Sequence, residues 1–192
     1  MWKDELTPTS TELFHSPTGP RVAIPSVVKE IFLFFTTTVL QHIVDRSNKY
    51  ALEFLEEVGR KETWTIITIE ELLAYMGFMI LMGIVKLPSI DDCWRRDEVF
   101  HYAPVANRIS RDRFRELHRF LHFADNSLLL APGTPDYDKL GKVRPLINLL
   151  AERFSTVCSP DKHVSIDEAM IPFKGRSTLK QYMPKKTCTA RH

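Results

Sequence analysis

Apolar residues recur at helical spacing along most of this chain, from Pro25 to about Val157. A stripe that returns every three or four residues predicts an amphipathic helix packed on one side. The pattern predicts helices over about 25–35, 37–55, 69–86, 111–121 and 139–157, with a short element over 89–94. In the last helix an early Pro145 fits the first turns, and the residues expected to face inward are Val143, Leu146, Ile147, Leu150 and Phe154. We therefore expect a mainly helical fold over this part of the chain.

Helix start signals support these positions. Thr68-Ile69-Glu70-Glu71 is a capping box, in which the threonine and the second glutamate each satisfy a backbone N–H at the helix start. The run Leu72–Val85 that follows is apolar throughout and is bracketed by Glu70, Glu71 and Lys86. A membrane-spanning helix needs about 20 apolar residues. We therefore expect a helix buried in the protein core and not a transmembrane segment.

The period changes to two only after Pro160, in Val164 and Ile166 and again in Leu179, Gln181 and Met183. Alternation of this kind is typical of strands, so the fold class is mainly α with a short C-terminal β segment. We expect three parts, a flexible tail over 1–24, a helical domain over 25–160 and the start of a second domain over 161–192. The tail is expected to be loose because its prolines stand among serines and threonines with no apolar period.

Charge is distributed unevenly. The net charge is +2, but the chain has no acidic residue after Glu168. Six cations follow: Lys174, Arg176, Lys180, Lys185, Lys186 and Arg191. The three cysteines, Cys93, Cys158 and Cys188, contain no CxxC pair, so we expect reduced thiols and no zinc site.

The acidic pair Asp167-Glu168 stands where the predicted strand would end, directly before a basic turn. Carboxylates beside cations suit Mg²⁺ and phosphate chemistry, but two surface charges at a strand end are the more common interpretation of such a pair. The basic segment has two interpretations as well. Lys174, Arg176, Lys180, Lys185 and Lys186, with Tyr182 among them, suit contact with nucleic-acid phosphates, or they form a solvated basic end.

The predicted helix 111–121 has an apolar stripe that we expect to be buried, formed by Phe114, Leu117, Phe120 and Leu121. It carries arginines and histidines on the opposite side. Arg111, Arg113, Arg115 and Arg119 are a candidate DNA-facing stripe, but a solvated helix face is the more economical interpretation. His118 and His122 are four residues apart, yet the segment lacks the glutamate of an HExxH metal motif. We expect them to be surface histidines.

The string SIDEAMIPFKGRSTLKQYMPKK, residues 165–186, resembles the signature of the piggyBac transposase family and its domesticated host descendants. The resemblance extends upstream through IVDRSNKYA at 43–51, MGIVKLP at 82–88 and LHFAD at 121–125. It implies a helical dimerisation and DNA-binding domain followed by an RNase H-like nuclease domain. In the family, three catalytic aspartates (a DDE-type site) hold two metal ions, and the first of the three corresponds to Asp167. Mg²⁺ is thus the cofactor that the resemblance implies.

The match departs from the family pattern after Lys186, because the later aspartates and the family's cysteine-rich zinc module have no counterpart in residues 187–192. We therefore expect a chain truncated within the nuclease domain, catalytically inactive and nuclear. Its expected partners are DNA, bound weakly and largely without sequence specificity, and a second copy or a full-length relative. The alternatives are an active transposase or nuclease fragment that needs residues absent here, and a protein-interaction module or non-functional product.

Overall fold

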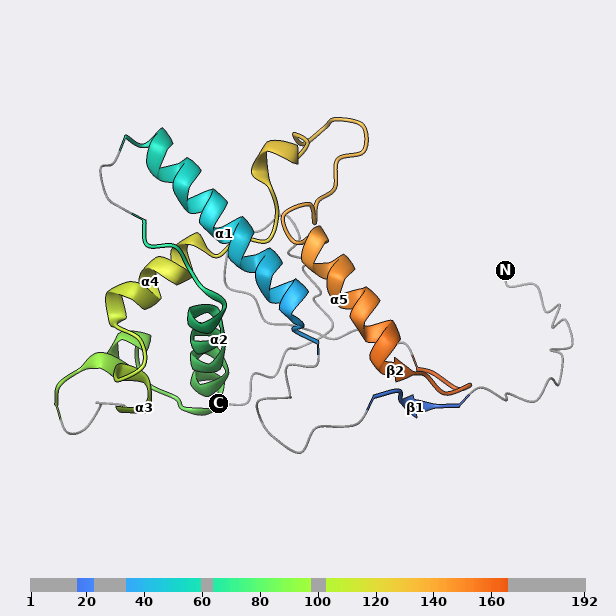
Figure 1. The fold of residues 1–192 in the computed structure, drawn as a ribbon, viewed down its shortest axis with the longest axis horizontal. Helices are drawn as coiled ribbons and strands as arrows, with labels where there is room; N and C mark the ends of the chain where they lie inside the picture. Colours follow the sequence, from blue (N-terminus) through green and yellow to red (C-terminus); the bar gives the residue numbers. More distant parts are fainter. Residues whose placement is uncertain (1–16, 23–33, 60–63, 98–102, 166–192) are drawn as a thin grey trace, which may run out of the picture. The chain divides into compact units, whose positions relative to one another are not determined.

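The computed structural model describes residues 17–22, 34–59, 64–97 and 103–165, and shows a mainly helical chain with one short strand pair (Figure 1). The helices are α1 (Thr37–Glu57), α2 (Ile69–Ile84), α3 (Ala103–Ala106), α4 (Arg111–Phe120) and α5 (Arg144–Val157). Two 3-10 turns, η2 (Ile90–Trp94) and η3 (Asn126–Leu128), and strands β1 (Gly19–Pro20) and β2 (Cys158–Ser159) complete the elements.

Most described elements belong to one compact unit, residues 32–152. Within this unit α1, α2 and α4 pack against one another (Figure 1). Their buried side chains form one apolar cluster: Val39, Leu40, Ile43 and Val44 from α1, Leu72, Tyr75 and Phe78 from α2, and Phe114 and Leu117 from α4. Burial of this surface is the main favourable term that holds the three helices together.

The predicted helix starts are confirmed at three positions. The Thr36 hydroxyl accepts a hydrogen bond from the Val39 amide at the start of α1. The capping box at Thr68 is complete, because the Thr68 hydroxyl accepts from the Glu71 amide and the Glu71 carboxylate accepts from the Thr68 amide. At the start of α4 the Ser110 hydroxyl accepts a hydrogen bond from the Arg113 amide. These caps satisfy N–H groups that a helix leaves without internal partners.

Helix α2 departs from the expectation of a fully buried core helix. Only Leu72, Tyr75 and Phe78 are buried, whereas Ile80 and Ile84 are 59% and 75% exposed. The prediction is therefore right for one side of α2 and wrong for the opposite side. Among the described residues, no helix combines the length and the apolar content that crossing a bilayer requires.

Helix α5 begins five residues later than predicted, at Arg144 instead of residue 139. The Asp138 carboxylate accepts hydrogen bonds from the Leu140 amide and the Arg144 guanidinium, and these contacts keep 138–143 in turns. Two residues predicted to face inward are exposed, Ile147 by 39% and Phe154 by 51%. Pro145, at the second position of α5, fits the first helical turn as expected.

The strand pair lies in the other unit, which contains the described residues 17–22 and 153–165. Gly19 is paired with Ser159 and Pro20 with Cys158, in antiparallel orientation. The Arg21 side chain donates to the Ser159 hydroxyl at 2.7 Å, and its amide donates to the Val157 carbonyl at 2.7 Å. The sequence pattern gave no sign of this pairing. The predicted alternation around 163–183 lies mainly outside the described residues.

Candidate nucleic-acid interface

The residues predicted to carry function lie outside the part of the chain that the structure describes. Asp167, the predicted catalytic and metal-binding carboxylate, is one of them, and so are the five predicted phosphate contacts Lys174, Arg176, Lys180, Lys185 and Lys186. Their roles stay predictions. The structure does describe the second candidate surface, the arginine-bearing side of α4.

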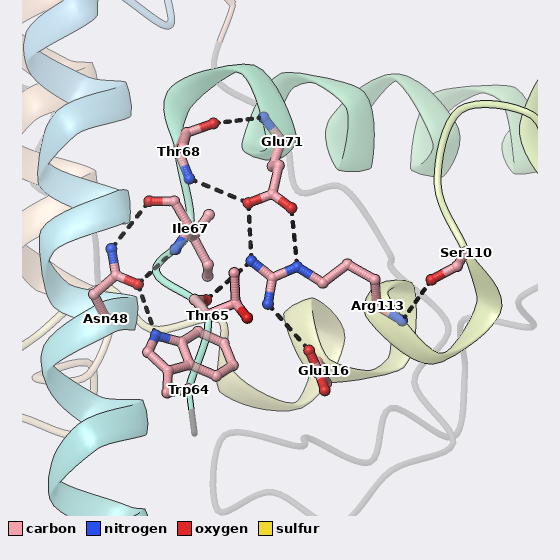
Figure 2. Close-up of polar contacts among 9 residues, drawn as sticks. All are labelled: Asn48, Trp64, Thr65, Ile67, Thr68, Glu71, Ser110, Arg113 and Glu116. Carbon is pink, nitrogen blue, oxygen red and sulfur yellow. Dashed lines mark hydrogen bonds and ion pairs between the residues drawn. The ribbon is translucent and has the colours of Figure 1, made fainter. Parts of the chain in front are cut away.

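Arg113 is not a free surface cation, because its guanidinium is held by groups from three segments (Figure 2). Nε and Nη2 donate to the two Glu71 carboxylate oxygens at 2.9 and 2.8 Å. Nη2 also donates to the Thr65 carbonyl at 3.0 Å, and Nη1 donates to Glu116 at 3.0 Å. The side chain of Arg113 is only 14% exposed. Arg113 therefore joins α4 to α2 and is not available to a phosphate.

The electrostatic consequences agree with this geometry. The Arg113 hydrogen bonds lower the pKa of the Glu71 carboxyl, and the same contact raises the pKa of the Arg113 guanidinium. Both groups are therefore held in their charged forms. A bidentate arginine–carboxylate pair fixes orientation as well as distance.

The segment 64–68, which leads into α2, is fixed from the α1 side by one asparagine (Figure 2). The Asn48 side-chain carbonyl accepts from the Ile67 amide at 2.8 Å and from Trp64 Nε1 at 2.9 Å. Its amide group donates to the Ile67 carbonyl at 3.1 Å. Asn48 thus satisfies both backbone groups of Ile67, as a neighbouring strand would. The Arg113 guanidinium lies 5.2 Å from the Trp64 ring centroid, which links the two networks.

The other arginines of α4 are also engaged. Arg115 forms an ion pair with Asp91 of η2, and Arg111 pairs with its neighbour Asp112 at 3.2 Å. The Arg119 guanidinium lies 5.0 Å from the ring centroid of Phe54 on α1. An arginine already paired with a carboxylate has to lose that contact before it can neutralise a phosphate. The arrangement favours the solvated-face interpretation of α4 over a DNA-facing stripe.

His118 and His122 do not form a common site. Tyr75 and His118 Nδ1 are 2.8 Å apart, whereas the His122 ring is stacked on Tyr50 at 4.0 Å between centroids. His122 Nε2 lies 2.9 Å from the Asn126 side-chain oxygen. Burial raises the pKa of the Tyr75 hydroxyl, so this group stays protonated beside His118. The expectation of surface histidines is right for His118, which is exposed, and right only in part for His122, which is half-buried.

A second charged junction holds α1 to the segment that follows α4. Asp125 forms ion pairs with Lys49 and with Arg46, the latter at 3.1 Å. The hydrogen bond from Lys49, together with that from the Ser127 hydroxyl, places the pKa of the Asp125 carboxyl well below its ordinary value. Beside it, the buried Ser47 hydroxyl donates to the His122 carbonyl and accepts from the His122 amide.

The described residues contain no group of three histidine, cysteine or acidic side chains placed to hold a metal ion. The carboxylates with the strongest contacts, Glu71 and Asp125, are neutralised by arginine and lysine. Mg²⁺ needs carboxylate oxygens free to coordinate it. The predicted magnesium ligand, Asp167, lies outside the described residues, so the magnesium site stays a prediction.

Sequence reasoning missed the two charged junctions. Glu71 was identified only as a capping residue, and Asp125 only as part of a family-like string. Their partners are 42 and 76 positions away in sequence. No local pattern could have indicated such pairs, because helix periodicity reports burial and not the identity of a distant neighbour.

Comparisons with known proteins agree with the fold. Residues 29–191 match the family model described as Transposase IS4. Human PiggyBac transposable element-derived protein 3 is 32% identical over 159 residues, which is 83% of this chain and 24% of that protein. Human PiggyBac transposable element-derived protein 2 is 32% identical over 78% of this chain and 23% of its own length.

Among solved structures, the chain is similar to the piggyBac transposase in a cryo-EM structure of its synaptic complex with hairpin DNA. The TM-score is 0.68 and the sequence identity 27%, with coverage of 89% of this chain and 36% of the transposase. The chain thus spans about a quarter of the length of its curated relatives and about a third of that transposase chain.

Proposed function

This chain belongs to the piggyBac transposase family, and we propose that it is a transposase-derived protein that binds DNA without cleaving it. The proposal is supported above all by one observation. The structural similarity covers 89% of the chain at 27% identity, and the similar protein is a transposase in complex with hairpin DNA. We therefore take DNA as the partner of this chain, and we expect a protein that binds DNA to be nuclear.

We place the main DNA contact on the basic segment and not on α4. The α4 arginines are held by Glu71, Asp91 and aromatic rings. The segment from Lys174 onward has six cations and no acid of its own. Phosphate neutralisation by such cations gives affinity without sequence information, so binding should be weak and largely non-specific.

Salt dependence of DNA binding tests this assignment. Each phosphate neutralised adds roughly 0.9 to the slope of log affinity against log salt concentration on duplex DNA. Alanine at Lys174, Arg176, Lys180, Lys185 and Lys186 should flatten the slope measured by fluorescence anisotropy with a labelled duplex. The matched control removes three exposed α4 arginines, Arg111, Arg115 and Arg119, and should leave the slope unchanged. A slope that responds only to the α4 variant would overturn the assignment.

We further propose that residues 1–192 do not cleave DNA on their own. Two-metal strand cleavage uses several carboxylates that converge on a pair of ions. Asp167 and Glu168 are the last acidic residues of the chain. The alternative is an active nuclease fragment that needs carboxylates absent from residues 1–192. A metal-dependent nicking assay on pure protein distinguishes this alternative from an inactive chain.

A second candidate function is association with another family chain, either a second copy or a full-length relative. The observation that favours it is the exposed apolar side of α2, where Ile80 and Ile84 lie in solvent. Exposed apolar residues gathered on one helix side are typical of a protein–protein contact.

A further inference from the structure

The chain between η3 and α5 forms a wide loop whose tip is exposed (Figure 1). Residues 130–137 all lie at the surface. Two backbone hydrogen bonds hold this tip, from the Thr134 amide to the Ala131 carbonyl and from the Tyr137 amide to the Thr134 carbonyl, both at 3.2 Å. Each bond closes a four-residue turn, so contacts within the loop itself shape its tip.

The residues inside the two turns match the backbone geometry that the turns need. Pro132 precedes Gly133, whose φ is 92°, and Pro135 precedes Asp136, whose φ is 64°. Proline followed by a residue with positive φ is the arrangement of a type II turn. Thr134 ends the first turn and begins the second, so it lies at the junction of the two turns.

The Thr134 hydroxyl is an accessible acceptor. Thr134 is exposed, and its hydroxyl donates to the Ala131 carbonyl at 2.7 Å. Proline-directed protein kinases transfer phosphate to a serine or threonine that is followed directly by proline, and many of them favour a second proline two positions before the acceptor. Pro135 and Pro132 occupy these two positions. Bonds confined to two adjacent turns of an exposed loop open at low cost, which allows the tip to enter a kinase cleft.

The Ser159-Pro160 pair offers a comparison, because its hydroxyl has different surroundings. Ser159 lies in β2 and is only 8% exposed. Its hydroxyl accepts a hydrogen bond from Arg21 Nε at 2.7 Å, and Gly19 of β1 is its strand partner. To reach a kinase, Ser159 has to leave the strand pair. Thr134 is therefore the accessible one of these two acceptors.

We propose that Thr134 is a phosphorylation site for a proline-directed protein kinase, with ATP as the phosphate donor. The Thr134 oxygen forms a bond to the γ-phosphorus of ATP, the bond from that phosphorus to the β–γ bridging oxygen breaks, and ADP leaves. The hydroxyl proton passes to the catalytic aspartate of the kinase. Residues 126–143 contain two aspartates and two lysines, so a phosphate of charge about −1.5 to −2 makes a neutral loop acidic. The modification does not depend on the proposed DNA binding.

Kinase treatment of the full chain tests the acceptor. With a purified mitogen-activated protein kinase and Mg²⁺-ATP, mass spectrometry should show phosphate on Thr134 at least about tenfold faster than on Ser159, because Ser159 must first leave its strand. Thr134→Ala and Pro135→Ala should each remove the phosphate from this loop. Thr156→Ala is the matched control, since Thr156 is exposed but is followed by valine, and it should leave the rate at Thr134 unchanged. A full chain that takes up no phosphate at Thr134, or takes it up faster at Ser159, overturns the proposal.

Two peptides separate the effect of exposure from that of sequence. Peptides spanning residues 128–140 and 153–165 carry the two acceptors without the fold. The first peptide and the full chain should react at Thr134 at rates within about threefold of each other, because the loop tip opens easily. The second peptide should react at Ser159 faster than the full chain does. A peptide that is phosphorylated at Thr134 beside an unreactive full chain would show that the turns do not open, and the proposal would then be wrong.

Discussion

Glu71 and Arg113 meet through two parallel hydrogen bonds of 2.9 and 2.8 Å, although 42 positions separate them in sequence. The same Glu71 carboxylate accepts from the Thr68 amide and completes the cap of α2. One side chain therefore starts a helix and attaches it to α4. The unit formed by residues 32–152 depends on this contact for the relative position of two of its core helices.

Removal of the guanidinium should destabilise this unit. We expect Arg113→Ala to lower the free energy of unfolding by about 2 kcal/mol, because it leaves Glu71 partly buried without its partner. The value is reduced from that of a fully buried pair because Glu71 keeps some solvent contact. Urea denaturation followed by circular dichroism measures the change. Arg111→Ala, which removes an exposed arginine of the same helix, should stay within about 0.5 kcal/mol of wild type.

Acid should weaken the same contact. The pKa of Glu71 is lowered in the folded chain, so its contribution to stability is complete above its ordinary pKa of 4.5 and disappears as the pH falls through the lower, folded value. Wild type should therefore lose more stability between about pH 6 and about pH 3 than Glu71→Gln does. The urea midpoint at each pH provides the measurement. Glu57→Gln, at the exposed end of α1, should show the wild-type loss; an equal loss in Glu71→Gln would contradict the assignment.

The single asparagine that fixes the segment before α2 is a second test of the fold. Asn48→Ala leaves the Ile67 amide and the Trp64 indole N–H without their acceptor, and we expect a cost of about 1–3 kcal/mol. The fluorescence of Trp64 should also shift as its N–H loses its partner. Asn148→Ala, an exposed position on α5, is the control and should change neither signal. Wild-type stability in Asn48→Ala would show that water replaces the amide at no cost.

The proposed absence of catalysis has a direct test. Pure protein incubated with Mg²⁺ or Mn²⁺ and a duplex carrying a transposon end should show no nicking on a denaturing gel. Nicking that persists through purification but disappears in Asp167→Ala would disprove the proposal. Asp161→Ala is a suitable control, because Asp161 is an exposed aspartate six residues earlier.

The sequence was most informative where one local rule decides the outcome. The Thr68–Glu71 capping box was predicted from four residues and is present, and the buried stripe Phe114, Leu117, Phe120 followed from spacing alone. Periodicity was wrong at Ile147 and Phe154, which have an apolar pattern but remain exposed. An apolar stripe indicates which side of a helix could be buried, and tertiary contact decides whether it is.

The candidate site was harder to predict from the sequence than the helices were. From the sequence, a solvated face is the preferred interpretation of the α4 arginines over a DNA-facing stripe, and the positions of Glu71 and Asp91 support that preference. These partners come from other elements, so their proximity depends on the packing of the whole unit. The roles of Asp167 and the basic segment stay predictions, since they fall outside the described residues.

The hydroxyl of Ser47 makes two bonds to the backbone of His122, 75 positions later. During synthesis, α1 leaves the ribosome well before the residues that hold it exist. Contacts between residues so far apart form late, because the intervening loop must close first. The part of α1 that packs on α4 therefore stays uncovered until about residue 125 has emerged. A nascent chain that stops before this point exposes apolar surface that a chaperone can bind.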